Sequence, residues 1–162
     1  MSVEERAIKS EKLLHVCSLS LVLFALCTVG CAFPRIIILD DPLSPEEHIN
    51  LGVAYEKQGE LDNALLEYEK ASEKIPQAYL YTGNIYLQKN DYENAEKSYK
   101  KALRKDTQNA DARNNLAWLY YLQKKNLEEA EKLTLEAIAL NPVKQDIYQD
   151  TLDKVRELKN KR

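Results

Sequence analysis

The chain has 162 residues, and its 23 Lys and Arg against 26 Asp and Glu give a formal net charge of −3 and a pI near 5.5. Hydrophobic residues make up 44%, which is enough for a core and excludes a chain that is disordered over most of its length. The mild acidity argues against a nucleic-acid-binding protein, because that class usually shows a basic excess. Four glycines and five prolines are too few for a collagen-like or many-turned all-β protein. The length fits one domain of about 100–150 residues with a short extension.

The first thirty residues have the layout of an export signal. Arg6, Lys9 and Lys12 precede an apolar run from Leu19 to Val29, and small residues follow. A basic stretch, a short apolar stretch and a small-residue end are typical of a signal peptide. The segment ends in Thr28-Val29-Gly30-Cys31, which resembles the lipobox of bacterial lipoproteins.

The lipobox resemblance implies lipidation of the Cys31 thiol and removal of residues 1–30. The residue after the cysteine is Ala32, which in Gram-negative sorting implies the outer membrane. We therefore predict a protein of the bacterial cell envelope, lipid-anchored in the outer membrane and facing the periplasm. The alternative is an uncleaved anchor, because Leu13 to Phe33 is about as long as the ~20 residues that span a bilayer. All three cysteines lie within the first 31 residues, which excludes a disulfide framework for the main domain.

Residues 31–44 form a short tether that contains an aliphatic run, Ile36 to Leu39. One interpretation is an extended segment that packs on the domain that follows. The other is a strand that adds to the sheet edge of a partner, where backbone hydrogen bonds supply the affinity. The same run is a candidate for self-association.

The remainder of the chain is internally repetitive. Leu51–Lys57 and Thr82–Gln88 superpose without a gap at an offset of 31 residues, and a third copy follows at an offset of 34 to 35. Each copy is predicted to be two amphipathic helices, with breaks near Gly59, Asn90 and Lys125. Such a unit cannot bury its apolar face alone, so the copies must stack on one another.

The recurring positions resemble the tetratricopeptide repeat, in which small residues, aromatic residues and proline stand at fixed spacings. The residues that carry the resemblance are Gly52, Tyr55, Ala64, Tyr68, Ala71 and Pro76, then Gly83, Tyr86, Ala95, Tyr99 and Ala102, then Ala117, Tyr120, Ala130, Ala137 and Pro142. The resemblance implies an all-α fold, a right-handed superhelical array of three helix-turn-helix repeats. We place the repeats at residues 45–142, approximately 45–75, 76–109 and 110–142.

A capping helix is predicted over residues 143–162, where apolar residues recur at helical spacing. These residues are Ile147, Tyr148, Thr151, Leu152, Val155 and Leu158. We expect them to face inward and the charged residues of the helix to face outward.

The residues carry no pattern of an enzyme. After Cys31 the only histidine is His48, which is placed in the first turn of a helix. No metal-ligand spacing and no glycine-rich phosphate loop is present. The prediction is a non-catalytic protein without a metal or cofactor.

The resemblance also implies a concave groove, lined by the first helix of each repeat, that holds a peptide or a helix. Carried onto this sequence, the predicted groove residues are Asn50, Val53, Tyr81, Asn84, Asn114, Asn115, Trp118 and Tyr121. Asparagines can donate and accept hydrogen bonds along an extended backbone, and aromatic residues dominate binding energy at interfaces. We predict an adaptor that binds an envelope protein and reaches the membrane through the lipid on Cys31. The alternatives are an accessory subunit of an envelope enzyme or export machine, and a self-assembling subunit.

Overall fold

The computed structural model describes residues 41–161. The predicted signal peptide, Cys31 and the run from Ile36 to Leu39 lie outside the described residues. Within residues 41–161 every regular element is helical: α2 (Pro45–Gln58), α3 (Leu61–Ala71), α4 (Ala78–Gln88), α5 (Tyr92–Lys105), α6 (Ala110–Leu122), α7 (Leu127–Leu140), a 3₁₀ turn (Pro142–Lys144) and α8 (Gln145–Asn160).

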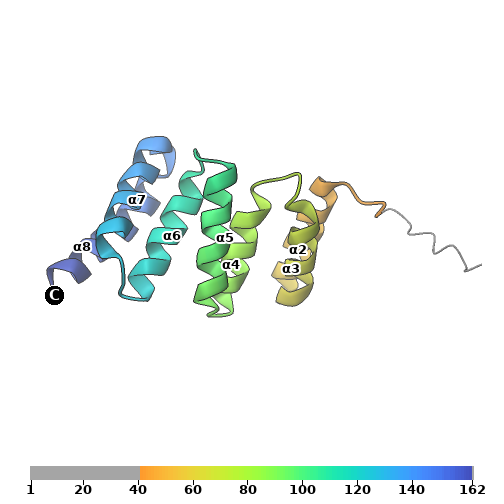
Figure 1. Ribbon diagram of the computed structural model, residues 1–162, viewed down its shortest axis with the longest axis horizontal. Helices are drawn as coiled ribbons and strands as arrows, with labels where there is room; N and C mark the ends of the chain where they lie inside the picture. Colours follow the sequence, from red (N-terminus) through yellow and green to blue (C-terminus); the bar gives the residue numbers. More distant parts are fainter. Residues whose placement is uncertain (1–40, 162) are drawn as a thin grey trace, which may run out of the picture. The chain divides into compact units, whose positions relative to one another are not determined.

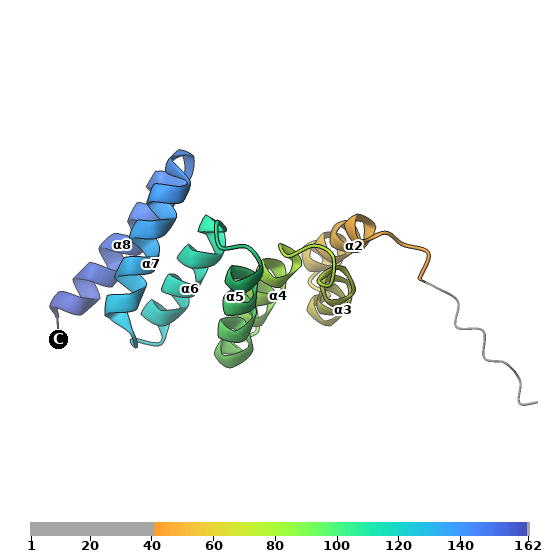
Figure 2. The same cartoon turned by 45° about the horizontal axis from the view of Figure 1, so that its top comes forward.

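The helices follow one another in chain order along a row, with α2 and α3 at one end and α7 and α8 at the other (Figures 1 and 2). Helices α2 and α3, α4 and α5, and α6 and α7 form three successive pairs, and α8 packs against both α6 and α7. The predicted all-α repeat array with a C-terminal helix is confirmed.

Each pair turns at a residue in the left-handed backbone conformation. These residues are Gly59, Asn90 and Lys124, with φ of 78°, 58° and 51°, and they occupy the same position of successive repeats. Glycine and asparagine adopt this conformation at low cost. The helix breaks that the sequence predicted near these three positions are therefore where the chain reverses.

The first helix of the array begins at a side-chain cap. The backbone N–H of Glu47 donates to Ser44 Oγ at 3.2 Å, and the N–H of Ser44 donates to Glu47 Oε2 at 2.7 Å. This reciprocal pair is a capping box and defines where α2 begins.

The core of the first two repeats is built around a glycine and a tyrosine. A Cβ atom on Gly52 would lie 2.4 Å from Tyr68 Cε1, and one on Gly83 would lie 2.4 Å from Tyr99 Cε1. Both tyrosines are fully buried, so each ring lies flat on the helix surface that its glycine leaves open. The third repeat has Ala117 and Thr134 at the same two positions, and both are buried. Where alanine replaces the smaller glycine, threonine therefore replaces the larger tyrosine.

Two details differ from simple repetition. Helix α3 has 11 residues whereas α5 and α7 have 14, so the three residues by which the first repeat is short are missing from its second helix. In α8, the residues Tyr148, Thr151, Leu152 and Val155 are buried, but Ile147 is 62% exposed. The prediction that Ile147 faces inward is wrong. The buried residues of α8 start at Tyr148 and recur every three or four residues, and Ile147 lies to one side of this stripe.

Candidate binding groove

Helices α2, α4 and α6, the first helices of the three repeats, share one face, which we call the first-helix face. Polar contacts join neighbouring first helices across it. Gln88 Nε2 donates to Glu56 Oε1 at 2.9 Å between α4 and α2, and Asn115 Nδ2 donates to Asn84 Oδ1 at 2.8 Å between α6 and α4. The predicted groove residues of successive repeats are thus brought side by side.

The face is hollowed between α2 and α4. The hollow has a volume of about 190 Å³, and the residues that line it are Glu46, Ile49, Asn50, Ile75, Gln77 and Tyr81. Two predicted groove residues, Asn50 and Tyr81, therefore lie at one depression. Asn50 is exposed and its side chain makes no hydrogen bond with any residue of 41–161, so its side-chain amide is available to a ligand.

Sequence reasoning did not place Ile75 at this hollow. It lies in the turn between α3 and α4, next to Pro76, and not on a first helix. The shortness of the first repeat was the signal, because α3 ends early and the turn that follows it lies beside the start of α2.

The Tyr81 ring forms the wall of the hollow and is fixed by stacking. Its centroid lies 5.2 Å from that of Tyr68, with 29° between the ring planes. Gln77 Nε2 donates to the Tyr81 hydroxyl at 3.3 Å. An aromatic side chain that is held in place loses little further entropy when a ligand packs on it.

Asn84 lies at the centre of a hydrogen-bond junction. Its Oδ1 accepts from the Tyr99 hydroxyl at 3.0 Å as well as from Asn115. The side chain therefore links α4, α5 and α6, and its oxygen is already used. Only its Nδ2 group, for which the part of the chain in the structure supplies no acceptor, remains for a ligand.

The aromatic residues of the third repeat form a second platform. Trp118 stacks on Tyr121 with 4.9 Å between ring centroids and 28° between planes. Lys154 Nζ of α8 lies 5.1 Å from the centre of the Trp118 ring, which is a cation–π distance. Helix α8 thus covers part of the first-helix face where a fourth repeat would otherwise continue.

Two predicted groove residues are placed differently from the rest. Asn114 is only 7% exposed, and its Oδ1 is buried without a hydrogen-bond partner in the structure. It lies one helical turn before Trp118 on α6, and its amide is not presented to solvent. Val53 is half-buried and packs against the core cluster around Ala64, Tyr68 and Ile85.

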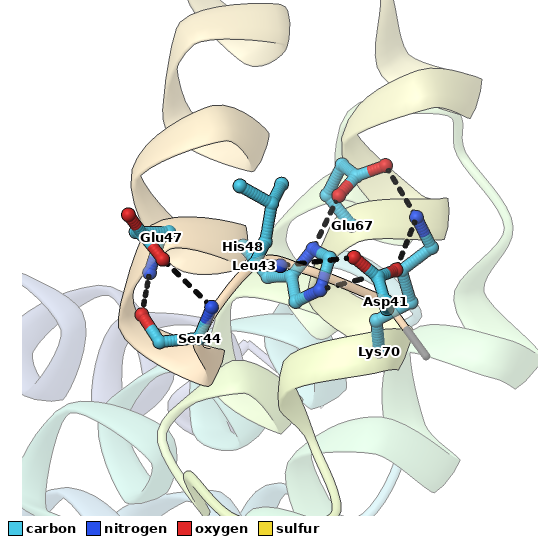
Figure 3. A network of polar contacts seen from close by, with 7 residues as sticks. All are labelled: Asp41, Leu43, Ser44, Glu47, His48, Glu67 and Lys70. Atoms are coloured by element: carbon cyan, nitrogen blue, oxygen red, sulfur yellow. Dashed lines mark hydrogen bonds and ion pairs between the residues drawn. The ribbon is translucent and has the colours of Figure 1, made fainter. Parts of the chain in front are cut away.

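A buried polar network ties the start of the array together (Figure 3). His48 Nδ1 lies 2.6 Å from Glu67 Oε2, and His48 Nε2 lies 3.4 Å from Asp41 Oδ2. Lys70 Nζ contacts the same two carboxylates at 3.2 and 3.3 Å. The hydrogen bond from the Leu43 N–H, and after it the contact with Lys70, holds the pKa of the Asp41 carboxyl below its usual value.

The geometry of this network fits a structural role, in which it links α2 and α3. Both ring nitrogens of His48 face carboxylates, and the histidine is 4% exposed. A general base needs a ring nitrogen that a substrate can reach, and a buried imidazole between two acids does not offer one.

Within residues 41–161 no group of three or more His, Cys, Asp or Glu side chains could hold a metal ion. No helix of that same range is long and apolar enough to cross a bilayer.

Comparison with known proteins identifies the repeats. A model described as TPR repeat matches residues 83–124, and two described as tetratricopeptide repeat match residues 45–78 and 110–144. The human protein O-mannosyl-transferase TMTC2 is 36% identical over 101 residues, which are 59% of this chain, and the chain spans only 12% of that relative. An uncharacterized protein of Haemophilus influenzae is 27% identical over 165 aligned positions, 89% of this chain and 92% of the relative.

Solved structures share the fold. The TPR2B domain:pHsp70 complex of yeast Sti1 has a TM-score of 0.65 at 16% identity and covers 70% of this chain and 96% of its own. The first TPR of Spaghetti (RPAP3), bound to an HSP90 peptide, has a TM-score of 0.64 at 23% identity and covers 74% and 96%. PcrH from Pseudomonas aeruginosa has a TM-score of 0.66 at 18% identity and covers 75% and 98%. At these identities the similarity establishes the architecture.

Proposed function

Residues 45–144 are tetratricopeptide repeats, and we propose from this premise that the protein is a non-catalytic adaptor whose first-helix face binds a peptide or helix of a partner protein. The observation that carries the proposal is the hollow between α2 and α4, where the unpaired amide of Asn50 lies beside the fixed ring of Tyr81. Two of the structural relatives, the domains of Sti1 and Spaghetti, were solved in complex with pHsp70 and with an HSP90 peptide, respectively. This chain shares their architecture.

The chemistry of the hollow favours an uncharged or weakly basic ligand. Its lining holds one carboxylate, Glu46, and no cation, so an acidic ligand would find nothing to pair with. Asn50 and Gln77 supply amide groups that can donate to and accept from a peptide backbone. Ile49, Ile75 and Tyr81 supply the apolar surface that an anchoring side chain would bury.

We further propose that the repeats are tethered to the bacterial cell envelope by lipid on Cys31, in the outer membrane and facing the periplasm. The support is the order of basic residues, apolar run and lipobox-like ending in residues 1–31. The relative of matching length is also bacterial. The tether of residues 31–44 reaches at most ~50 Å when extended, so the partner of such an adaptor would be an envelope protein close to the membrane.

Affinity capture from crosslinked envelope fractions tests both parts. We expect Asn50→Arg to lose the captured partner, because a long cation fills the hollow, and we expect Cys31→Ser to lose membrane association. Asn63→Arg is the matched control, since Asn63 is an exposed asparagine on α3 whose side chain bonds only to the nearby Glu60.

The two parts fail separately. Equal recovery of partners by Asn50→Arg and Asn63→Arg would contradict the groove. Membrane association of Cys31→Ser as strong as that of the wild type would contradict the lipid anchor and favour an uncleaved transmembrane segment.

A further inference from the structure

A second and larger hollow lies away from the first-helix face. Its volume is about 400 Å³, and helices α3, α4 and α5 enclose it. No residue lines both hollows. A volume of this size falls within the range of about 300–1,000 Å³ that is usual for small-molecule sites.

The hollow exists because three positions that hold leucine in the next repeat hold small hydroxyl residues here. Ser72, Thr82 and Ser98 line it. At the repeat offsets of 31, 34 and 35 residues, the corresponding residues between the second and third repeats are Leu103, Leu116 and Leu133. Those leucines lie in or against the core cluster of the second and third repeats. The same packing site is thus filled in one interface and open in the other.

The charges of the two interfaces also differ. Lys97, Lys101 and Arg104, spaced four and three residues apart on α5, line the open hollow. Their counterparts on α7 are Lys132, Glu136 and Ala139. In the filled interface Glu136 is neutralised, since Arg113 Nε donates to it at 2.9 Å.

The cations of the open hollow are largely unneutralised. The Arg104 guanidinium makes no hydrogen bond or ion pair with any residue of 41–161. Lys101 Nζ lies 4.3 Å from the centre of the Tyr79 ring and has no carboxylate partner in the same range. Hydrogen bonding with Ser72, and after it the proximity of Lys101, holds the pKa of the Tyr79 hydroxyl below its usual value. Lys97 alone is paired, with Glu93 at 2.6 Å.

We propose that this hollow binds a small phosphate monoester. Glu93 offsets the charge of Lys97, whereas Lys101 and Arg104 have no carboxylate partner among the described residues. The lining also holds one carboxylate, Glu69. Two positive charges of the hollow are therefore available to a ligand, in a chain whose formal charge is −3. A phosphate monoester carries about −1.5 to −2 charges at neutral pH, whereas one carboxylate would leave half of that positive charge unmatched. Leu65, Tyr79 and Tyr86 supply apolar wall for the carbon part of the ligand. Its source is either a soluble metabolite or a phospholipid headgroup.

Calorimetric titration of the full-length chain with sn-glycerol 3-phosphate tests the proposal. We expect saturable binding by the wild type and about a hundredfold weaker binding by Lys101→Gln/Arg104→Gln, at about tenfold for each charged hydrogen bond lost. The matched control is Lys57→Gln/Lys132→Gln, which removes the same charge from two exposed lysines outside the hollow. The control must bind as the wild type does.

Ser98→Leu gives an independent readout, because it places in the hollow the residue that the third repeat carries at the same position. We expect it to lose the ligand while circular dichroism and the unfolding midpoint stay at or above wild-type values. Flotation with vesicles of phosphatidylcholine, with and without phosphatidic acid, distinguishes the two sources of the ligand. Flotation that requires phosphatidic acid and is lost in Lys101→Gln/Arg104→Gln identifies a lipid headgroup. Binding of the soluble ester without flotation identifies a metabolite.

Three results would overturn the proposal. The first is binding of neither the soluble ester nor the phosphatidic acid vesicles. The second is equal binding by Lys101→Gln/Arg104→Gln and its control. The third is preferential binding of an acidic peptide, which would make the hollow a protein-docking site. Because the two hollows share no residue, none of these results bears on the proposed function of the first-helix face.

Discussion

Replacement of Gly83 by alanine is expected to lower the free energy of unfolding by about 2 kcal/mol. The new Cβ would lie 2.4 Å from Cε1 of Tyr99, whose side chain is fully buried and cannot swing aside. Overpacking of a close-packed core costs about 1–3 kcal/mol and occasionally more. The better helix propensity of alanine, about 1 kcal/mol, offsets only part of that cost. Urea unfolding followed by circular dichroism measures the difference.

The third repeat supplies the matched comparison. Ala117 occupies the position of Gly83 and is fully buried, so Ala117→Gly should cost about 1–2 kcal/mol, from helix propensity and the loss of a buried methyl group, with no overpacking. The double variant Gly83→Ala/Tyr99→Thr reproduces the Ala117 and Thr134 pair. Its cost should be smaller than the sum of its two single variants, because each single change disturbs the contact that the other removes. A wild-type unfolding midpoint for Gly83→Ala, or strict additivity in the double variant, would show that the tyrosine ring does not depend on the glycine.

Replacement of His48 by alanine is expected to cost about 2 kcal/mol of unfolding free energy. Glu67 is 6% exposed, and His48 is its nearest partner at 2.6 Å. Without the imidazole, the buried carboxylate keeps only Lys70 at 3.2 Å and loses a short hydrogen bond that solvent cannot replace. Leaving a buried acceptor unsatisfied costs its desolvation free energy, about 1–3 kcal/mol.

A paired substitution distinguishes this cost from simple loss of packing. His48→Leu/Glu67→Met fills the same space with apolar side chains and leaves no buried charge, so it should be milder than either His48→Ala or Glu67→Ala. Unfolding in urea at constant pH is the measurement. If the double variant is less stable than both single variants, the network itself stabilises the start of the array more than an apolar core would.

The repeat architecture could be predicted because it depends on local sequence motifs and on residues that recur at a fixed spacing. Gly52 and Gly83 stand 31 residues apart, and each is followed by a tyrosine at the same distance, Tyr68 and Tyr99. The turn residues Gly59 and Asn90 are likewise of types that accept a positive φ. Ser44 and Glu47 mark the first helix start through chemistry that acts within four residues.

The parts that could not be predicted depend on contacts between distant segments. The bond between His48 and Glu67 joins two helices across 19 residues, and nothing local marks either residue as buried. Asn114 was predicted to line the groove, but it is buried, and that burial depends on the side chains of other helices that pack around α6. The larger hollow is visible in the sequence only when Ser72, Thr82 and Ser98 are aligned with the leucines of the next repeat.

The central claim is that the first-helix face holds the partner, and site-specific photocrosslinking tests it most directly. A photoreactive residue at Asn50 lies at the mouth of the hollow between α2 and α4, and the same residue at Asn63 lies on an exposed position of α3 outside it. We predict crosslinks to one defined partner segment from position 50 and none to that segment from position 63. Crosslinks to the same segment from both positions, or from position 63 alone, would contradict the groove as the binding site.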